Sequence, residues 1–111
     1  MAYDENLAER IRAKLKCTRG LSEKKMFGGV GFMINGNMAC GVIKQDMVVR
    51  LNGDEAEAAL QRAHVKVFDM TGKPMKGWIL VEPQGVASDK ALQAWINQST
   101  AFARSLPPKQ P

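Results

Sequence analysis

A glycine-punctuated apolar run with Asn-Gly near its centre constrains the fold of this chain more than any other feature of the sequence. The run covers residues 26–43 and reads MFGGVGFMINGNMACGVI. Asn35 and Gly36 separate two apolar stretches, and these residue types best tolerate the positive φ angles that a two-residue type I′ turn requires. The sequence therefore predicts a β-hairpin in the middle of the chain.

Apolar and alternating segments on both sides of this turn predict an antiparallel meander. The expected strands cover residues 24–27, 30–34, 38–43 and 47–51, and a further strand covers residues 78–82. A two-residue hairpin loop would place Phe32 opposite Ala39. The same loop would place Met33 opposite Met38, and a longer loop would shift both pairs.

Apolar residues spaced three or four positions apart predict two long helices that pack against the sheet. Residues 4–18 carry one apolar stripe, and a second long helix begins at Ser88 or Asp89. Trp95 lies in the apolar stripe of this second helix. We expect Trp95 to be a core anchor rather than a platform on which a nucleic-acid base stacks.

A shorter helix is expected after Asn52-Gly53-Asp54, where Asp54 and Glu57 resemble a capping box. The single histidine, His64, follows it and is expected to be a surface or capping group. The predicted fold class is α+β. It consists of an antiparallel sheet of about four to six strands, arranged as a meander and flanked by an N-terminal and a C-terminal helix.

The length of 111 residues fits one compact domain. We expect a single domain over residues 1–106 and a disordered, proline-rich tail over residues 107–111. The apolar stretches are shorter than the roughly 20 residues of a membrane span, and residues 1–5 lack the basic and apolar regions of a signal peptide. A cytoplasmic location without membrane contact is therefore expected.

Three glycines, Gly28, Gly29 and Gly31, are more than an ordinary strand tolerates, and they indicate a special backbone feature. One interpretation is a bend in the sheet, and the other is a loop that cradles a phosphate. A dinucleotide-binding fingerprint would need glycine where the chain has Ile34, and no Gly-Lys-Ser/Thr follows. The bend is the favoured interpretation.

The chain is basic, with 16 Lys and Arg against 11 Asp and Glu and a net charge of +5, which favours anionic partners. The cations of the first helix straddle its apolar stripe: Arg10 and Lys14 lie on one edge, Arg12 and Lys16 on the other. The candidate binding surface consists of other cations, mostly on predicted turns: Arg19, Lys24, Lys25, Lys44, Arg50, Lys73 and Lys76.

Among these cations, Arg50 is singled out by the alternation of its strand. It points away from the apolar face and could anchor an anion or a carboxylate of a partner protein. The plainer interpretation is a strand residue that faces solvent. The pattern alone leaves both open.

Side chains that could perform chemistry are scattered along the sequence. Cys17 lies near the end of the first helix and Cys40 lies in the hairpin, and we expect both to be free thiols packed as small core residues. Cys40, His64 and Arg50 form no recognisable catalytic pattern. We assign no catalytic, cofactor-binding or metal-binding residues, and we expect a protein that is not an enzyme.

Four motifs, in their order along the chain, carry a family resemblance: Met26-Phe27-Gly28-Gly29 with Gly31, Met38-Ala39-Cys40-Gly41, Val48-Val49-Arg50-Leu51 and Met75-Lys76-Gly77-Trp78. Together they resemble the amino-terminal domain of the TfoX (Sxy) family of bacterial competence regulators, over about residues 8–103. The motif residues expected to be structural are Phe27, Gly28, Gly29, Gly31, Gly41, Gly77, Trp78 and Trp95.

This resemblance implies an α+β domain that helps to control the transcription of DNA-uptake genes. Full-length members act together with the cyclic-AMP receptor protein and carry a second, helical domain, which this chain ends too early to include. We therefore expect a stand-alone regulatory domain that needs no cofactor and binds a protein of the transcription machinery. Direct nucleic-acid binding is the alternative, and a small enzyme is a third. The seven methionines could line a homodimer surface or fill the core, and the sequence leaves this open.

Overall fold

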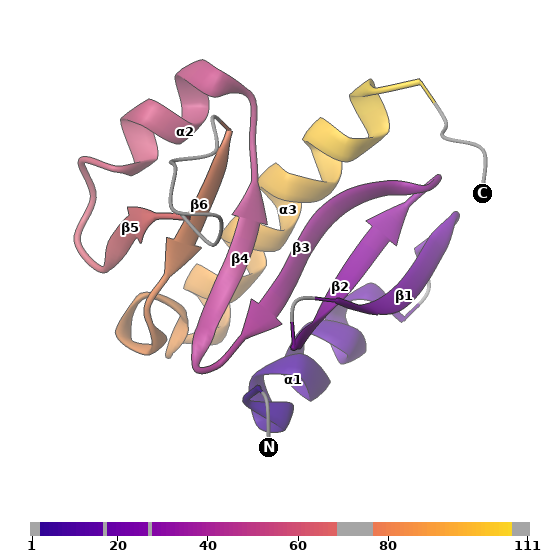
Figure 1. Ribbon diagram of the computed structural model, residues 1–111, viewed down its shortest axis with the longest axis horizontal. Coiled ribbons are helices and arrows are strands. Elements are labelled where there is room, and N and C mark those ends of the chain that lie inside the picture. The colour runs from indigo at the N-terminus through magenta and orange to yellow at the C-terminus, as the bar shows by residue number, and fades with distance from the viewer. Residues whose placement is uncertain (1–2, 17, 27, 69–76, 108–111) are drawn as a thin grey trace.

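The computed structural model describes residues 3–16, 18–26, 28–68 and 77–107 (Figure 1). In chain order the elements are α1 (Glu5–Leu15), β1 (Leu21–Met26), β2 (Gly29–Ile34), β3 (Asn37–Ile43), β4 (Asp46–Arg50), α2 (Gly53–Ala59), β5 (Val65–Val67), β6 (Trp78–Val81), the 3-10 helix η1 (Pro83–Val86) and α3 (Asp89–Ser105). The predictions made for Cys17, Phe27, Lys73 and Lys76, and for all of the tail except Pro107, lie outside these residues.

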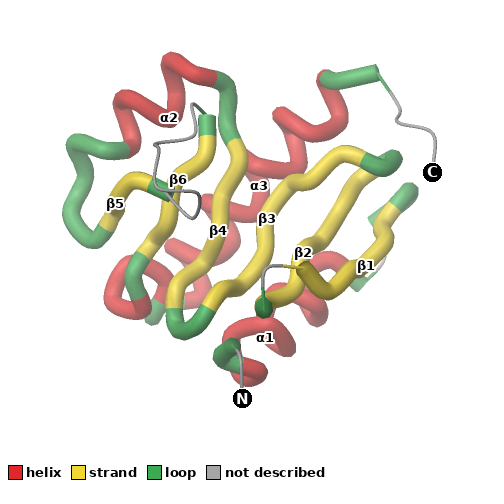
Figure 2. The backbone as a smooth tube through the Cα atoms, in the orientation of Figure 1, coloured by secondary structure: helices red, strands yellow, loops and turns green. Residues whose placement is uncertain are grey.

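The strands form one antiparallel sheet in the order β1-β2-β3-β4-β6-β5, with β1 and β5 at its edges (Figure 2). Helices α1 and α3 pack on one face, and α3 passes behind β3 and β4 in Figure 1. The predicted α+β class, with its antiparallel sheet and its N-terminal and C-terminal helices, is confirmed. Within the described ranges, no helix combines the length and apolar character that a membrane span requires.

Each long helix begins at a polar capping side chain and buries one apolar stripe. Asp4 caps α1, and its carboxylate accepts hydrogen bonds from the backbone N–H groups of Asn6 and Leu7. Ser88 caps α3 in the same way, with its Oγ 3.1 Å from the backbone nitrogen of Ala91. Trp95 is 3% exposed in the main core, which confirms it as a core anchor. Helix α1 ends at Leu15, three residues before the predicted end.

The hairpin between β2 and β3 has the predicted two-residue turn and an unexpected bulge. Asn35 and Gly36 both have positive φ angles, 53° and 82°. Met33 lies opposite Met38, as predicted. The predicted pair of Phe32 with Ala39 is wrong, because the register shifts at this point and Phe32 lies opposite Cys40. Ala39 is the extra residue of a β-bulge, which sequence alternation does not reveal.

The glycine-rich segment makes a turn and then lets two strands approach closely. Gly28 has a φ of 74° in the turn between β1 and β2. A Cβ atom on Gly29 would lie 2.1 Å from the carbonyl oxygen of Val42 in β3, and one on Gly41 would lie 2.3 Å from that of Val30 in β2. The segment continues into a strand and not into the helix that a nucleotide loop requires. Gly28 therefore allows the turn, and Gly29 and Gly41 allow β2 and β3 to approach closely.

The region from α2 to β6 differs from the sequence prediction in two details. Helix α2 is capped by Asn52, whose side-chain oxygen is 2.8 Å from the backbone nitrogen of Glu55, and not by Asp54 as predicted. A strand at Val65–Val67 was not predicted, because three residues are too few for a periodic signal. This strand, β5, is held in its extended conformation by antiparallel pairing with β6.

The sheet face away from α1 and α3 carries a second apolar cluster. Its buried members are Met38, Ile43, Val48 and Phe68, and the partly buried Trp78 and Leu80 pack against them. The rings of Phe68 and Trp78 have their centroids 5.8 Å apart and are tilted by 48°. This second face therefore combines buried and partly accessible apolar side chains beside the end of β4.

Candidate functional site

Arg50, the last residue of β4, lies against two aromatic rings. Its Cζ atom is 5.2 Å from the centroid of the Trp78 ring and 5.5 Å from the centroid of the Phe102 ring. Both distances fall within the roughly 6 Å over which a guanidinium is attracted to an aromatic face. All three side chains are partly buried. We refer to Arg50, Trp78 and Phe102 as the Arg50 clamp.

The β4–β6 pairing brings the first two members of the clamp together. Arg50 and Trp78 lie directly opposite each other in the antiparallel register. Just before Trp78, Gly77 has a φ of 87°, and its carbonyl oxygen is 2.7 Å from the backbone nitrogen of Leu51. A Cβ atom on Gly77 would lie only 2.7 Å from the carbonyl oxygen of Leu51. The Gly77-Trp78 motif therefore allows the close strand contact that seats the indole beside Arg50.

The third member of the clamp, Phe102, comes from α3, which packs on the other side of the sheet. The pairs between β3 and β4 run from Ile43 with Asp46 to Cys40 with Val49, so Arg50 lies beyond the last pair. Past the bulge at Ala39, β3 curves away from β4, and the last turns of α3 are visible between them in Figure 1. Phe102 therefore reaches Arg50 where the sheet is open.

The Arg50 guanidinium differs from the other well-placed arginines in its partners. Arg10 pairs with Asp89 at 3.3 Å, and Arg12 pairs with Glu23 at 2.7 Å and also with Glu9. No acidic side chain in the described part of the chain forms an ion pair with Arg50. Among the described residues, the neighbours recorded for its positive charge are therefore the rings of Trp78 and Phe102.

The other cations of the predicted binding surface that the structure describes do not gather around Arg50. Arg19, Lys24 and Lys25 are exposed on the edge strand β1 or in the turn before it. Lys24 and Lys25 are neighbours in a strand and thus point to opposite faces of the sheet. Lys44 is exposed in the turn at the opposite end of β4, with a φ of 55°. The structure separates the described members of this predicted surface.

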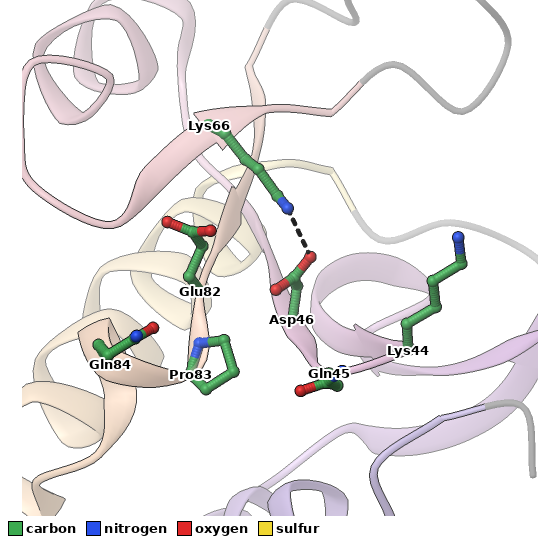
Figure 3. Close-up of a pocket in the computed structure, with 7 residues that line it drawn as sticks. All are labelled: Lys44, Gln45, Asp46, Lys66, Glu82, Pro83 and Gln84. Carbon is green, nitrogen blue, oxygen red and sulfur yellow. Dashed lines mark ion pairs between the residues drawn. The ribbon is translucent and has the colours of Figure 1, made fainter.

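A polar pocket of about 440 Å³ lies at the other end of β4 and was not predicted (Figure 3). It is lined by Lys44, Gln45, Asp46, Lys66, Glu82, Pro83 and Gln84. Lys66 Nζ is 3.0 Å from Asp46 Oδ2, whereas the Lys44 side chain points away from this pair in Figure 3. The lining of this pocket comes from the β3–β4 turn, the start of β4, β5 and the segment from Glu82 into η1, so no local sequence signal marks it.

The side chains considered for catalysis lie apart from one another. Cys40 is fully buried between β3 and α3, and burial raises the pKa of its thiol to about 12, with a small opposing effect of the Ser99 hydroxyl. His64 is exposed, with a φ of 66°, and its carbonyl oxygen accepts a hydrogen bond from the backbone N–H of Glu82. Across the described ranges, no three His, Cys, Asp or Glu side chains are grouped to hold a metal ion.

The comparison with known proteins gives one match. The family model of the TfoX N-terminal domain matches residues 13–103, which include β1 to β6 and most of α3. No curated protein and no solved structure matches the chain significantly. Because the match spans most of the 111 residues, the chain belongs to the TfoX N-terminal domain family.

Proposed function

We propose that this protein is a non-enzymatic regulatory domain that binds a protein of the transcription machinery and helps to control DNA-uptake genes in the bacterial cytoplasm. The observation that carries this proposal is the match to the TfoX N-terminal domain over residues 13–103. That family is expected to contribute to competence regulation. A binding domain needs an accessible recognition surface and no catalytic group.

The placement of the polar side chains supports a binding role. Cys40 lies on the helix-covered face of β3, and its raised pKa keeps it protonated at neutral pH. His64 lies in the turn before β5, and Arg50 lies at the end of β4 on the opposite face of the sheet from Cys40. For catalysis, a nucleophile such as Cys40, a base such as His64 and a cation such as Arg50 would have to lie within hydrogen-bond distance of one another. These three groups lie on separate elements.

The distribution of positive charge supports a protein partner over a nucleic acid. Nucleic-acid affinity grows with the number of phosphates that a protein contacts together. Lys24 and Lys25 point to opposite faces of β1, and Lys44 lies at the far end of β4 from Arg50. Arg10, Arg12 and Lys14 are occupied by Asp89, Glu9 and Glu23. In the described part of the chain, the cations are too dispersed to contact a row of phosphates together, and this favours a protein partner.

A direct binding measurement tests this proposal. The labelled domain is titrated with purified cyclic-AMP receptor protein in the presence of cyclic AMP, with and without duplex DNA that carries the receptor's site, and separately with RNA polymerase. Saturable binding to either protein is expected, and a basic protein of similar size serves as the control. Absence of binding to both proteins would contradict the proposal.

Direct nucleic-acid binding is a second candidate, favoured by the exposed cations Arg19, Lys24 and Lys25 on one edge of the sheet. The test is a fluorescence titration against duplex DNA, single-stranded DNA and RNA across a salt series. Submicromolar binding that weakens steeply with salt would indicate several phosphate contacts and would support this candidate. If Lys24→Glu with Lys25→Glu binds as tightly as the unaltered protein, the candidate loses its structural basis.

A further inference from the structure

We propose that the Arg50 clamp is a carboxylate-binding site that receives an Asp or Glu side chain of a partner protein. This inference rests on the proposed function and adds to it the site and the chemistry of the contact. The clamp consists of Arg50 from β4, Trp78 from β6 and Phe102 from α3.

No described residue forms a hydrogen bond or an ion pair with the Arg50 guanidinium, so none of them occupies its N–H groups. A guanidinium that contacts aromatic rings through its flat face keeps its N–H groups in the plane, directed away from the rings. Two of these N–H groups match the two oxygens of a carboxylate in a bidentate contact. In the described residues no Asp or Glu already occupies this position at Arg50. Within residues 3–16, 18–26, 28–68 and 77–107, no carboxylate therefore competes with one from a partner protein.

The surroundings of the clamp strengthen such a contact. Arg50, Trp78 and Phe102 are partly buried, so the ion pair would form in a region with less water than the open surface. Leu80 lies two residues beyond Trp78 on the same sheet face and is also partly buried. An acidic side chain that is flanked by apolar residues would fit both the guanidinium and this apolar border.

The separation of Arg50 from the other described cations favours a protein carboxylate over the phosphates of a nucleic acid. Lys44 lies in the turn at the opposite end of β4, and the strand from Asp46 to Arg50 spans about 13 Å. Lys24 lies on β1, three strand spacings from β4, or about 14 Å across the sheet. Arg104 follows Phe102 by two positions on α3, and side chains two apart on a helix do not face each other. Among the described cations, Arg50 therefore offers a single contact and does not belong to a row of positive charges.

The probe is a short acidic peptide, acetyl-Gly-Leu-Glu-Leu-Gly-amide, titrated into the full chain labelled with nitrogen-15. The resonances to follow are the Nε–H of Arg50 and the indole N–H of Trp78. We expect saturable shifts of both. The same peptide with Gln in place of Glu should cause much smaller shifts, because it lacks the charge. A separate titration with an oligothymidylate tests whether Arg50 binds phosphate groups instead.

Variants connect the shifts to the clamp. Arg50→Lys keeps the charge but loses the planar fork, and it should weaken binding of the acidic peptide about ten-fold. Lys24→Gln removes an exposed cation elsewhere on the sheet and should leave binding unchanged. Phe102→Leu removes one ring and should weaken binding about three-fold, which provides a second variant if Arg50→Lys fails to fold.

Three results would overturn the inference. The first is equal binding of the acidic peptide by Arg50→Lys and by the unaltered protein. The second is equal binding of the Glu and Gln peptides. The third is a shift of Arg50 by oligothymidylate and not by the acidic peptide, which would identify a phosphate site.

The proposed function and this inference can fail separately. The titration with cyclic-AMP receptor protein and RNA polymerase is repeated with Arg50→Lys. If a protein partner binds both forms equally, the regulatory function stands and the carboxylate site is wrong. If the acidic peptide binds at Arg50 and neither transcription protein binds, the site stands and the proposed partner is wrong.

Discussion

Arg12 in α1 holds the carboxylate of Glu23 in β1 through two parallel hydrogen bonds. The Nε–Oε1 distance is 2.9 Å and the Nη2–Oε2 distance is 2.7 Å. The ionised carboxylate accepts these two bonds from the positively charged guanidinium better than a protonated carboxyl group does, so the contact with Arg12 holds the pKa of Glu23 below its usual value. This bidentate pair ties the N-terminal helix to the edge strand of the sheet.

Replacement of Glu23 by Gln should therefore destabilise the protein in a pH-dependent manner. Both side chains of the pair are about one-third exposed, so the loss at neutral pH should be about 0.5 to 1 kcal/mol. The pKa of Glu23 is lower in the folded state, so the pair stabilises the fold above the unfolded value near 4.5. This stabilisation is lost as the pH falls through the folded pKa.

Urea unfolding of both forms at neutral pH and at about pH 3 measures this effect. The difference in unfolding free energy should be present at neutral pH and largely absent at the lower pH. Glu57→Gln, on the exposed side of α2, is the matched control and should show little change at either pH. A difference that persists unchanged in acid would show that Glu23 stabilises the fold by something other than its charge.

Truncation of Trp95 should be among the most destabilising single changes in the chain. The indole is 3% exposed, packs in the main core and lies under the Arg62 guanidinium, whose Cζ is 4.4 Å from the ring centroid. Trp95→Ala should cost roughly 3 to 5 kcal/mol, measured by chemical denaturation. Gln98→Ala, at an exposed position of the same helix, should change stability by less than about 0.5 kcal/mol. A loss below about 1 kcal/mol for Trp95→Ala would contradict the anchor role.

Gly41→Ala should destabilise the sheet although alanine is only one methyl group larger. The added Cβ would lie 2.3 Å from the carbonyl oxygen of Val30 and 3.1 Å from the Cα of Gly31. These are backbone atoms that cannot rotate away, so β2 and β3 would have to separate. We expect a cost of about 1 to 3 kcal/mol in chemical denaturation. Ser22→Ala, on the exposed part of β1, is the control, and an equal effect of both variants would exclude the backbone clash as the cause.

The Cys40 thiol should be unreactive in the native protein. It is fully buried, and burial raises its pKa to about 12, so the reactive thiolate is almost absent at neutral pH. In a Cys17→Ser background, an aromatic disulfide reagent should label Cys40 only after denaturation in guanidinium chloride. Rapid labelling of the native protein would contradict the buried position and would reopen the case for a nucleophile.

The parts of the fold that the sequence predicts correctly are those with a local periodic or turn signal. Asn35-Gly36 predicted the hairpin turn, and the apolar spacings predicted α1 and α3. The bulge at Ala39 was missed because β3 is apolar from Met38 to Ile43, so no alternation marks a change of register. Strand β5 was missed because its three residues gain their strand conformation from β6.

The candidate site was predictable in one member only. Alternation along β4 correctly placed Arg50 on the face away from Val49. The sequence left open whether Arg50 faces solvent or binds a partner, and it did not indicate the two aromatic rings near its guanidinium. No spacing rule links Arg50 to Trp78, which reaches it through the β4–β6 pairing, or to Phe102, which reaches it from α3 beyond the end of the β3–β4 ladder.

The sequence by itself determined the elements of this protein, because turn angles, helix caps and apolar stripes depend on residues within a few positions of one another. It also carried the motifs by which the family was recognised. Only the tertiary structure decided the bulge, the strand β5, the pairing of Arg12 with Glu23 and the assembly of the Arg50 clamp. These features depend on close packing between residues far apart in the chain, for which local sequence patterns hold no signal.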